Sequence, residues 1–122
     1  MVRYALAFGV VVVGVAVMGA SEAAETFRQL KGKEIADRLT GMEFTDGVHW
    51  AHVFKRRGSL SSVSMGKKET GAWRIEKNEL CLDWENERDC YEVWVSGRNL
   101  QLRLPGSEFV MEGVLQKPEA RQ

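Results

Sequence analysis

The sequence predicts an exported, all-β protein: an antiparallel meander of about eight short strands, preceded by one short N-terminal helix, that forms a small barrel or a strongly curled sheet. Three observations support this fold class. The chain begins with an apolar leader, closely spaced segments with alternating apolar residues fill most of the remainder, and the two cysteines fall opposite one another in the clearest strand–turn–strand pattern. A chain of 122 residues suffices for one domain.

Residues 1–23 have the three parts of a secretory signal peptide. Arg3 supplies a positive charge, residues 5–20 contain no charged side chain, and Ser21 and Ala23 satisfy the small-x-small rule for cleavage after Ala23. Slightly earlier cleavage and an uncleaved anchor are the alternatives, although the apolar run is short for a bilayer span. The sequence therefore predicts a protein of the periplasm or the secreted fraction, in contact with a membrane only through this segment if it is uncleaved.

Residues 24–41 are predicted to form an N-terminal helical segment. Gly32 interrupts the pattern and can divide the segment in two, and Gly41 suits the left-handed position after the last helical turn. We expect this helix to pack across one end or edge of the sheet; a helix that binds a partner or a membrane surface is the alternative. Its apolar side chains lie near one face: Phe27, Leu30, Ile35 and Leu39.

Residues 42–116 contain a series of short strands separated by turn residues, among them the favoured hairpin dipeptide Asp46-Gly47. Because every connection is short, each strand is expected to pair with its neighbours in sequence. Residues 117–122 have little apolar content and are predicted to be a flexible tail. The predicted strands are residues 42–45, 48–54, 59–65, 71–76, 79–84, 88–96, 99–104 and 108–116.

The central hairpin, residues 79–96, predicts its own register. A turn centred between Glu85 and Asn86 places Cys81 opposite Cys90, and the same register places Asp83 opposite Arg88. We therefore expect a Cys81–Cys90 disulfide, in keeping with an oxidising compartment; two free cysteines in the core are the alternative. The other face of the hairpin collects an apolar set: Leu80, Leu82, Trp84, Tyr91, Val93 and Val95.

No arrangement of side chains typical of catalysis or of metal binding emerges from the sequence. His49 and His52 are three positions apart on a predicted strand, so they point to opposite faces and cannot share an ion; we expect surface or hydrogen-bonded histidines. The clustered serines have no nucleophile motif and are predicted to form a solvated strand face: Ser59, Ser61, Ser62 and Ser64. We therefore expect a protein that is not an enzyme and has no cofactor.

The charge is balanced, with 17 basic and 17 acidic residues, which gives no electrostatic reason to expect a nucleic-acid partner. In a meander, alternate turns fall at the same end of the sheet. One end would gather basic side chains that could bind a phosphate or carboxylate: Lys55, Arg56, Arg57, Lys77 and Arg98. The opposite end would be mainly acidic. An ordinary solvated surface is the alternative.

The tryptophans of the β-domain are expected to have different roles. Trp73 and Trp84 share faces with apolar neighbours and are predicted to lie in the core. Trp94 lies on the cysteine face of the hairpin, where it would pack over the disulfide or stand exposed as an anchor for a ligand or partner.

A family resemblance is visible in the spacing of Leu30, Gly32, Glu34, Ile35, Leu39 and Gly41, followed by Gly71-x-Trp73, Leu80-Cys81 and Cys90. This pattern resembles small exported bacterial proteins of unknown function, best known from alphaproteobacteria, in which a short helix precedes a compact β-domain. The resemblance implies the fold and no catalytic residue. The chain is also similar to small β-barrel inhibitors of secreted bacterial metalloproteases in its tryptophan and short disulfide, without a counterpart of their inserted N-terminal segment.

Two functions are compatible with these features. The first is a binding module that holds a small anionic or amphipathic ligand in a barrel mouth or on the basic rim. The second is an envelope protein that interacts with another protein, with protease inhibition as a special case. A well-formed cavity would favour the first, and a filled core with a large exposed apolar patch would favour the second.

Overall fold

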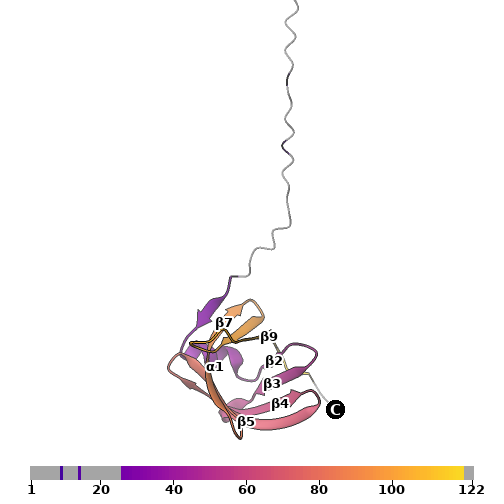
Figure 1. The fold of residues 1–122 in the computed structure, drawn as a ribbon, viewed down its shortest axis with the longest axis vertical. Helices are drawn as coiled ribbons and strands as arrows, with labels where there is room; N and C mark the ends of the chain where they lie inside the picture. The colour runs from indigo at the N-terminus through magenta and orange to yellow at the C-terminus, as the bar shows by residue number, and fades with distance from the viewer. Residues whose placement is uncertain (1–8, 10–13, 15–25, 120–122) are drawn as a thin grey trace, which may run out of the picture.

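The structure, a computed structural model, describes Gly9, Gly14 and residues 26–119. The predicted signal peptide and the end of the predicted tail therefore lie outside the described residues, apart from these two glycines. Within the described range the chain forms nine strands, one α-helix and a short 3₁₀ turn (Figure 1). The elements are β1 (Arg28–Leu30), α1 (Lys33–Leu39), β2 (Glu43–Thr45), β3 (Trp50–Phe54), the 3₁₀ turn (Arg56–Gly58), β4 (Ser59–Ser64), β5 (Lys67–Glu76), β6 (Glu79–Asp83), β7 (Arg88–Ser96), β8 (Asn99–Arg103) and β9 (Val110–Gln116).

Strands β2 to β9 form a closed antiparallel barrel. Each pairs with the next along the chain, as the meander predicted. The barrel is closed by β2, which also pairs with β9 from Glu43↔Gln116 to Thr45↔Val114. Closure satisfies the backbone groups that an open sheet would leave at its edges. Of the two forms that the sequence allowed, the barrel is therefore the one adopted.

The N-terminal segment differs from the predicted helix because its first part is a strand. Strand β1 pairs with β7 along residues 93–95. Strand β6 lies along the same edge of β7 as β1, but its pairing ends at Glu79↔Glu92. Without β1, the backbone groups of residues 93–95 on this edge of β7 would lack hydrogen-bond partners. Gly32, with a φ of 51°, separates this strand from α1. The need to complete the sheet outweighs the weak helical periodicity of residues 24–30.

Strand β5 begins earlier than predicted. Met65 and Gly66 both have positive φ values, 51° and 81°, as in the two-residue turns that join tight hairpins. This turn allows β4 and β5 to pair from Ser64↔Lys67 onward. Residues 67–70, predicted to be part of a turn, are therefore strand.

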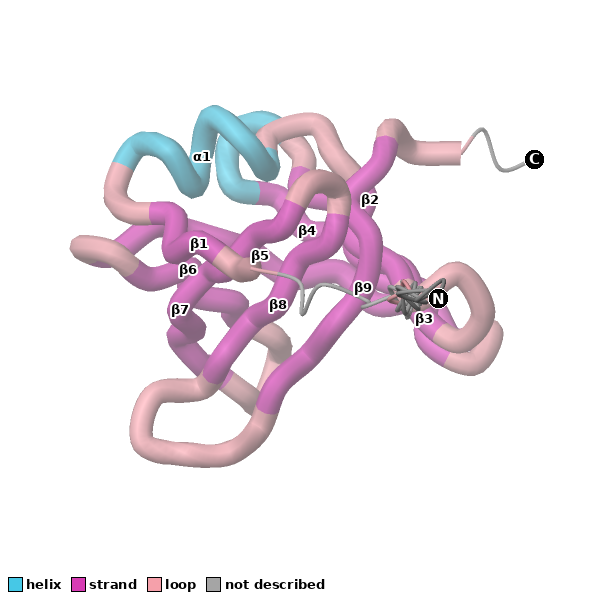
Figure 2. Tube along the Cα trace, turned by 90° about the horizontal axis from the view of Figure 1, so that it is seen from above, coloured by secondary structure: helices cyan, strands magenta, loops and turns pink. Residues whose placement is uncertain are grey.

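Helix α1 covers one end of the barrel, as expected (Figure 2). Ile35 and Leu39 are fully buried, and the Arg38 guanidinium donates a hydrogen bond to the Gly97 carbonyl in the β7–β8 turn. After the helix, the Gly41 amide donates to the Phe54 carbonyl at 2.7 Å. We call this the helix-covered end; the opposite end, where the loop between β8 and β9 lies, is the open end (Figure 2). No helix in the described part of the chain is long and apolar enough to cross a membrane.

The hairpin of β6 and β7 has the predicted register. Cys81 pairs with Cys90 and the two form a disulfide, and no described cysteine is free. Asp83 pairs with Arg88, whose Nε lies 3.0 Å from Asp83 Oδ1. The predicted apolar face points into the barrel, where all its members are buried except Trp84, which is partly buried.

Apolar side chains fill the barrel only from the helix-covered end to about its middle. The completely buried ones include Phe44, Phe54, Leu60, Leu80, Leu100 and Leu102. Beyond them, the alternation that places Phe54 and Leu60 inside brings His52 and Ser62 to interior positions nearer the open end. The interior thus changes from hydrocarbon to mixed polar and aromatic side chains along the barrel axis.

Candidate functional site

The unfilled half of the barrel forms a cavity at the open end. Its volume is about 1050 Å³, at the upper limit of typical small-molecule sites. Residues of β3 to β7, of β9 and of the β6–β7 and β8–β9 loops line it. Most of the lining residues belong to strands, so the shape of the cavity does not depend on the loops alone.

A stack of aromatic rings forms one wall of the cavity. His52 lies between two tryptophans, with its ring centroid 5.0 Å from that of Trp50 and 5.6 Å from that of Trp84. The Trp50 and His52 planes are 28° apart, and Phe44 packs edge-on against Trp50 at 4.8 Å. The rings support one another, which holds the faces of Trp50 and Trp84 in place along the cavity.

His52 is a buried, uncharged group in this wall. It is 8% exposed, and its Nδ1 is buried without a hydrogen-bond partner. Burial lowers the pKa of His52 to about 4, because the charged imidazolium would lose its hydration. The expectation that both histidines are surface or hydrogen-bonded groups is therefore wrong for His52. It is right for His49, whose exposed ring contacts the Asp46 carboxylate at 2.8 Å.

Serines add hydroxyl groups to the interior. Ser62 is 6% exposed and lines the cavity next to His52, its register partner on β3. Ser64 lines it nearer the opening. The predicted solvated face is therefore wrong for Ser62, which is an interior residue. Parity along the strand was the signal that could have found it, because Ser62 shares a face with Leu60.

The barrel wall is open beside Trp84. Strand β5 pairs with β4 along residues 67–72, but with β6 only from Ala72↔Asp83 onward. Its first residues therefore have a neighbour on one side only. Trp84, just after β6, packs against Gly71 in this opening: a Cβ atom at residue 71 would lie only 2.8 Å from Cε3 of the indole. The cavity consequently extends between β5 and the β6–β7 loop.

The five basic residues predicted as a ligand site lie away from this cavity. They occupy the β3–β4, β5–β6 and β7–β8 turns, at the helix-covered end, and none lines the cavity: Lys55, Arg56, Arg57, Lys77 and Arg98. Trp94, grouped with them as a candidate, is half-buried elsewhere on the barrel. Its ring lies 4.1 Å beneath the Arg103 guanidinium carbon, and its Nε1 donates to Glu92 at 3.1 Å.

Exposed apolar side chains gather at the open end. Among the described residues, the large hydrophobic side chains that are exposed are Val48, Met65, Phe109 and Val110. All four lie in, or next to, the β2–β3, β4–β5 and β8–β9 connections, which surround the cavity opening. Phe109 also lines the cavity. The open end therefore combines a cavity with an apolar rim.

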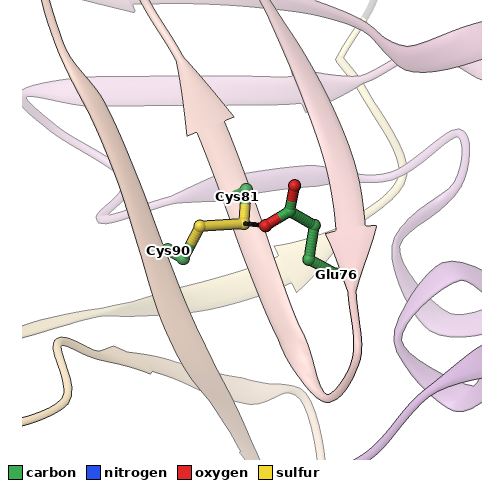
Figure 3. Close-up of side chains that lie close together, drawn as sticks. All are labelled: Glu76, Cys81 and Cys90. Carbon is green, nitrogen blue, oxygen red and sulfur yellow. Dashed lines mark hydrogen bonds between the residues drawn. A yellow bond between two sulfur atoms is a disulfide. The ribbon is translucent and has the colours of Figure 1, made fainter.

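One cluster in the described part of the chain places three potential metal-ligating side chains together, Glu76, Cys81 and Cys90, with ligand atoms within 4.8 Å of one another (Figure 3). Both sulfur atoms belong to the disulfide, so neither is the thiolate that a metal would need. The Glu76 carboxylate lies 3.8 Å from Cys81 Sγ. We regard this cluster as a structural feature of the neighbouring strands β5, β6 and β7.

Fold and cavity together define the class of this protein: a small, disulfide-linked antiparallel β-barrel, covered by a helix at one end and hollow at the other. No protein-family model, curated protein or solved structure matches the chain.

Proposed function

We propose that this chain is an exported, non-enzymatic binding protein that holds a small amphipathic ligand in the cavity at the open end. The observation that carries the proposal is the cavity itself, in which the faces of Trp50 and Trp84 stand beside the polar groups of His52 and Ser62. Such mixed lining suits a molecule with an apolar body and a few polar groups. The Cys81–Cys90 disulfide is compatible with an oxidising compartment.

Native mass spectrometry of the protein purified from the cells that produce it tests this proposal. A ligand carrier should show a reproducible additional mass that disappears on denaturation. The denatured mass also reports the site of signal cleavage and the two hydrogens lost in the disulfide. The variant Ser64→Trp, which places an indole in the cavity, should lose the additional mass, whereas Ser59→Trp, an exposed position at the helix-covered end, should retain it. Retention by both variants would contradict the cavity as the site.

A second candidate function is docking of another envelope protein, of which protease inhibition is one form. The apolar rim of Val48, Met65, Phe109 and Val110 favours it, since exposed apolar clusters are typical of interfaces. A protein without additional mass that captures one envelope protein in a pull-down, and loses it when Met65 and Phe109 are changed to Ser, would favour this candidate over the first.

A further inference from the structure

The charges at the open end indicate which class of amphipathic ligand the cavity suits. Two lysines and four carboxylates line it: Lys67, Lys68, Glu69, Glu85, Glu87 and Asp89. Lys67 Nζ lies 3.7 Å from a Glu69 carboxylate oxygen, so these two charges largely offset one another. The remaining charges are one lysine, Lys68, and three carboxylates, so the lining has a net negative charge.

These carboxylates act on a side chain inside the cavity. Tyr91 is 8% exposed and lines the cavity. Burial first, and then the charges of Asp89 and Glu87, raise the pKa of Tyr91. Burial disfavours a charge of either sign, whereas the negative charges of Asp89 and Glu87 favour a positive charge over a negative one near Tyr91. Asp89 also shares the inward-facing parity of Tyr91 on β7.

Aromatic faces beside these carboxylates strengthen the attraction for a cation. The π-electrons of Trp, Tyr and Phe make the ring face negative, and an ammonium group over it is stabilised. Trp50, Trp84, Tyr91 and Phe109 all line the cavity, and the Tyr91 and Phe109 rings are 6.5 Å apart. In the described residues, the cation–π pair that occurs, Arg103 over Trp94, involves none of these rings. Among the described residues, none therefore supplies a cation to the cavity rings.

The described side chains deeper in the cavity add no positive charge of their own. His52 is neutral at physiological pH because burial lowers its pKa to about 4. Its unpartnered, buried Nδ1 leaves hydrogen-bonding capacity on a side chain of the cavity wall, next to the Ser62 hydroxyl. In the described lining of this half of the barrel, the positive charges are those of Lys67 and Lys68, near the opening.

From these features we propose that the cavity binds a cationic amphipathic molecule, an organic ammonium whose apolar body lies against Trp50 and Trp84 and whose charge lies near Glu87 and Asp89. The inference rests on the proposed binding function and narrows it to one ligand class. It differs from the sequence-based expectation of an anionic ligand on the basic turns, which lie at the other end of the barrel.

Three probes with the same phenylbutyl body test the charge preference: phenylbutyltrimethylammonium, phenylbutanesulfonate and phenylbutanol. Each is titrated into the full mature protein, with tryptophan fluorescence and calorimetry as readouts. We expect the ammonium probe to bind about tenfold more tightly than the alcohol, and the sulfonate to bind more weakly than the alcohol. The advantage of the ammonium probe should shrink as salt is added, because exposed carboxylates are screened.

A pair of matched variants locates the charge. Glu87→Gln combined with Asp89→Asn should reduce ammonium binding several-fold and leave the alcohol unchanged. Asp37→Asn combined with Glu79→Gln changes the net charge equally, but on α1 and β6 at the helix-covered end, so it should leave all three affinities unchanged. An equal loss of ammonium binding in both double variants would contradict the placement of the ligand's charge near Glu87 and Asp89.

The outcomes separate this inference from the function on which it rests. Equal binding of all three probes, or tighter binding of the sulfonate, would overturn the cationic class while leaving the cavity as a binding site. If none of the probes binds, even at concentrations well above those at which carrier proteins bind their ligands, both the cationic ligand class and the proposed binding function would be overturned.

Discussion

Gly71 and Trp84 occupy complementary positions in the barrel wall. A Cβ atom at residue 71 would lie 2.8 Å from Cε3 of the Trp84 ring and 2.5 Å from the Asp83 carbonyl oxygen. Atoms of real side chains do not approach so closely, so the indole can lie in the opening between β5 and β6 only because residue 71 has no side chain. Glycine inside a strand commonly marks such a close approach. This contact places one aromatic face of the cavity.

Gly71→Ala should therefore destabilise the protein and displace Trp84. One of the two clashes is with backbone, so β5 and β6 must separate, and the expected loss is about 1–3 kcal/mol of unfolding free energy. Urea unfolding measures the loss, and a change in tryptophan emission reports the displaced indole. Thr70→Ala, at the exposed neighbouring position, is the control. A Gly71→Ala protein with the unfolding midpoint of the wild type would contradict this fit.

The Cys81–Cys90 disulfide should stabilise the protein modestly. It joins directly opposed residues of β6 and β7 that are nine positions apart. Closing so short a loop is worth about 2–3 kcal/mol in the chain-entropy model, and less where a turn already holds the strands together. We expect Cys81→Ala with Cys90→Ala to lower the unfolding free energy by about 1–2 kcal/mol. A reductant should destabilise the wild type by a similar amount and leave the double variant unaffected; a wild type insensitive to the reductant would be contrary to this view.

Helix α1 should be essential to stability because it closes the barrel core. Ile35 is completely buried, so Ile35→Ala removes apolar contacts and leaves a cavity, at an expected cost of about 2–5 kcal/mol. Asp37→Ala on the exposed side of the same helix should change stability by less than about 0.5 kcal/mol. Thermal unfolding of the two variants gives the comparison, and similar midpoints would mean that the helix is not part of the core.

The strands and the central register could be predicted from the sequence because the signals are local. Alternating apolar residues and short turns define each strand, and Cys81, Cys90, Asp83 and Arg88 agree on one register. Strand β1 was not predictable in this way. It exists because β6 is shorter than β7 and leaves a stretch of β7 without a partner, which is a property of the assembled sheet.

The cavity could be predicted only in part. The sequence allowed a barrel with space for a small ligand, and its topology separated a basic from an acidic end. Which end is hollow depends on where α1 packs, and the helical pattern of residues 33–39 carries no information about that. Strand parity placed His52 and Ser62 on faces shared with Phe54 and Leu60, but their polar character favoured the surface. Burial of a polar side chain is decided by what surrounds it.

Burial of His52 should make stability depend on pH. Its pKa falls from 6.5 to about 4 in the folded protein because of burial. Between these two values the unfolded chain binds a proton that the folded chain does not, so stability decreases as the pH falls through this window and is fully retained above it. At the lower end of this window, near pH 4, the shift corresponds to a loss of about 3 kcal/mol of unfolding free energy.

His52→Phe should remove this dependence, because it preserves an aromatic ring between Trp50 and Trp84 and abolishes the titration. Urea unfolding of the wild type and the variant at a series of pH values between 6.5 and 4 gives the two slopes. Carboxylates titrate in the lower part of this range in both proteins, so the difference between the slopes isolates His52. His49→Gln, at an exposed position, is the matched control for the loss of a histidine. Parallel curves for the wild type and His52→Phe would mean that the imidazole is hydrated in solution, and that the cavity wall is more open than its aromatic stack implies.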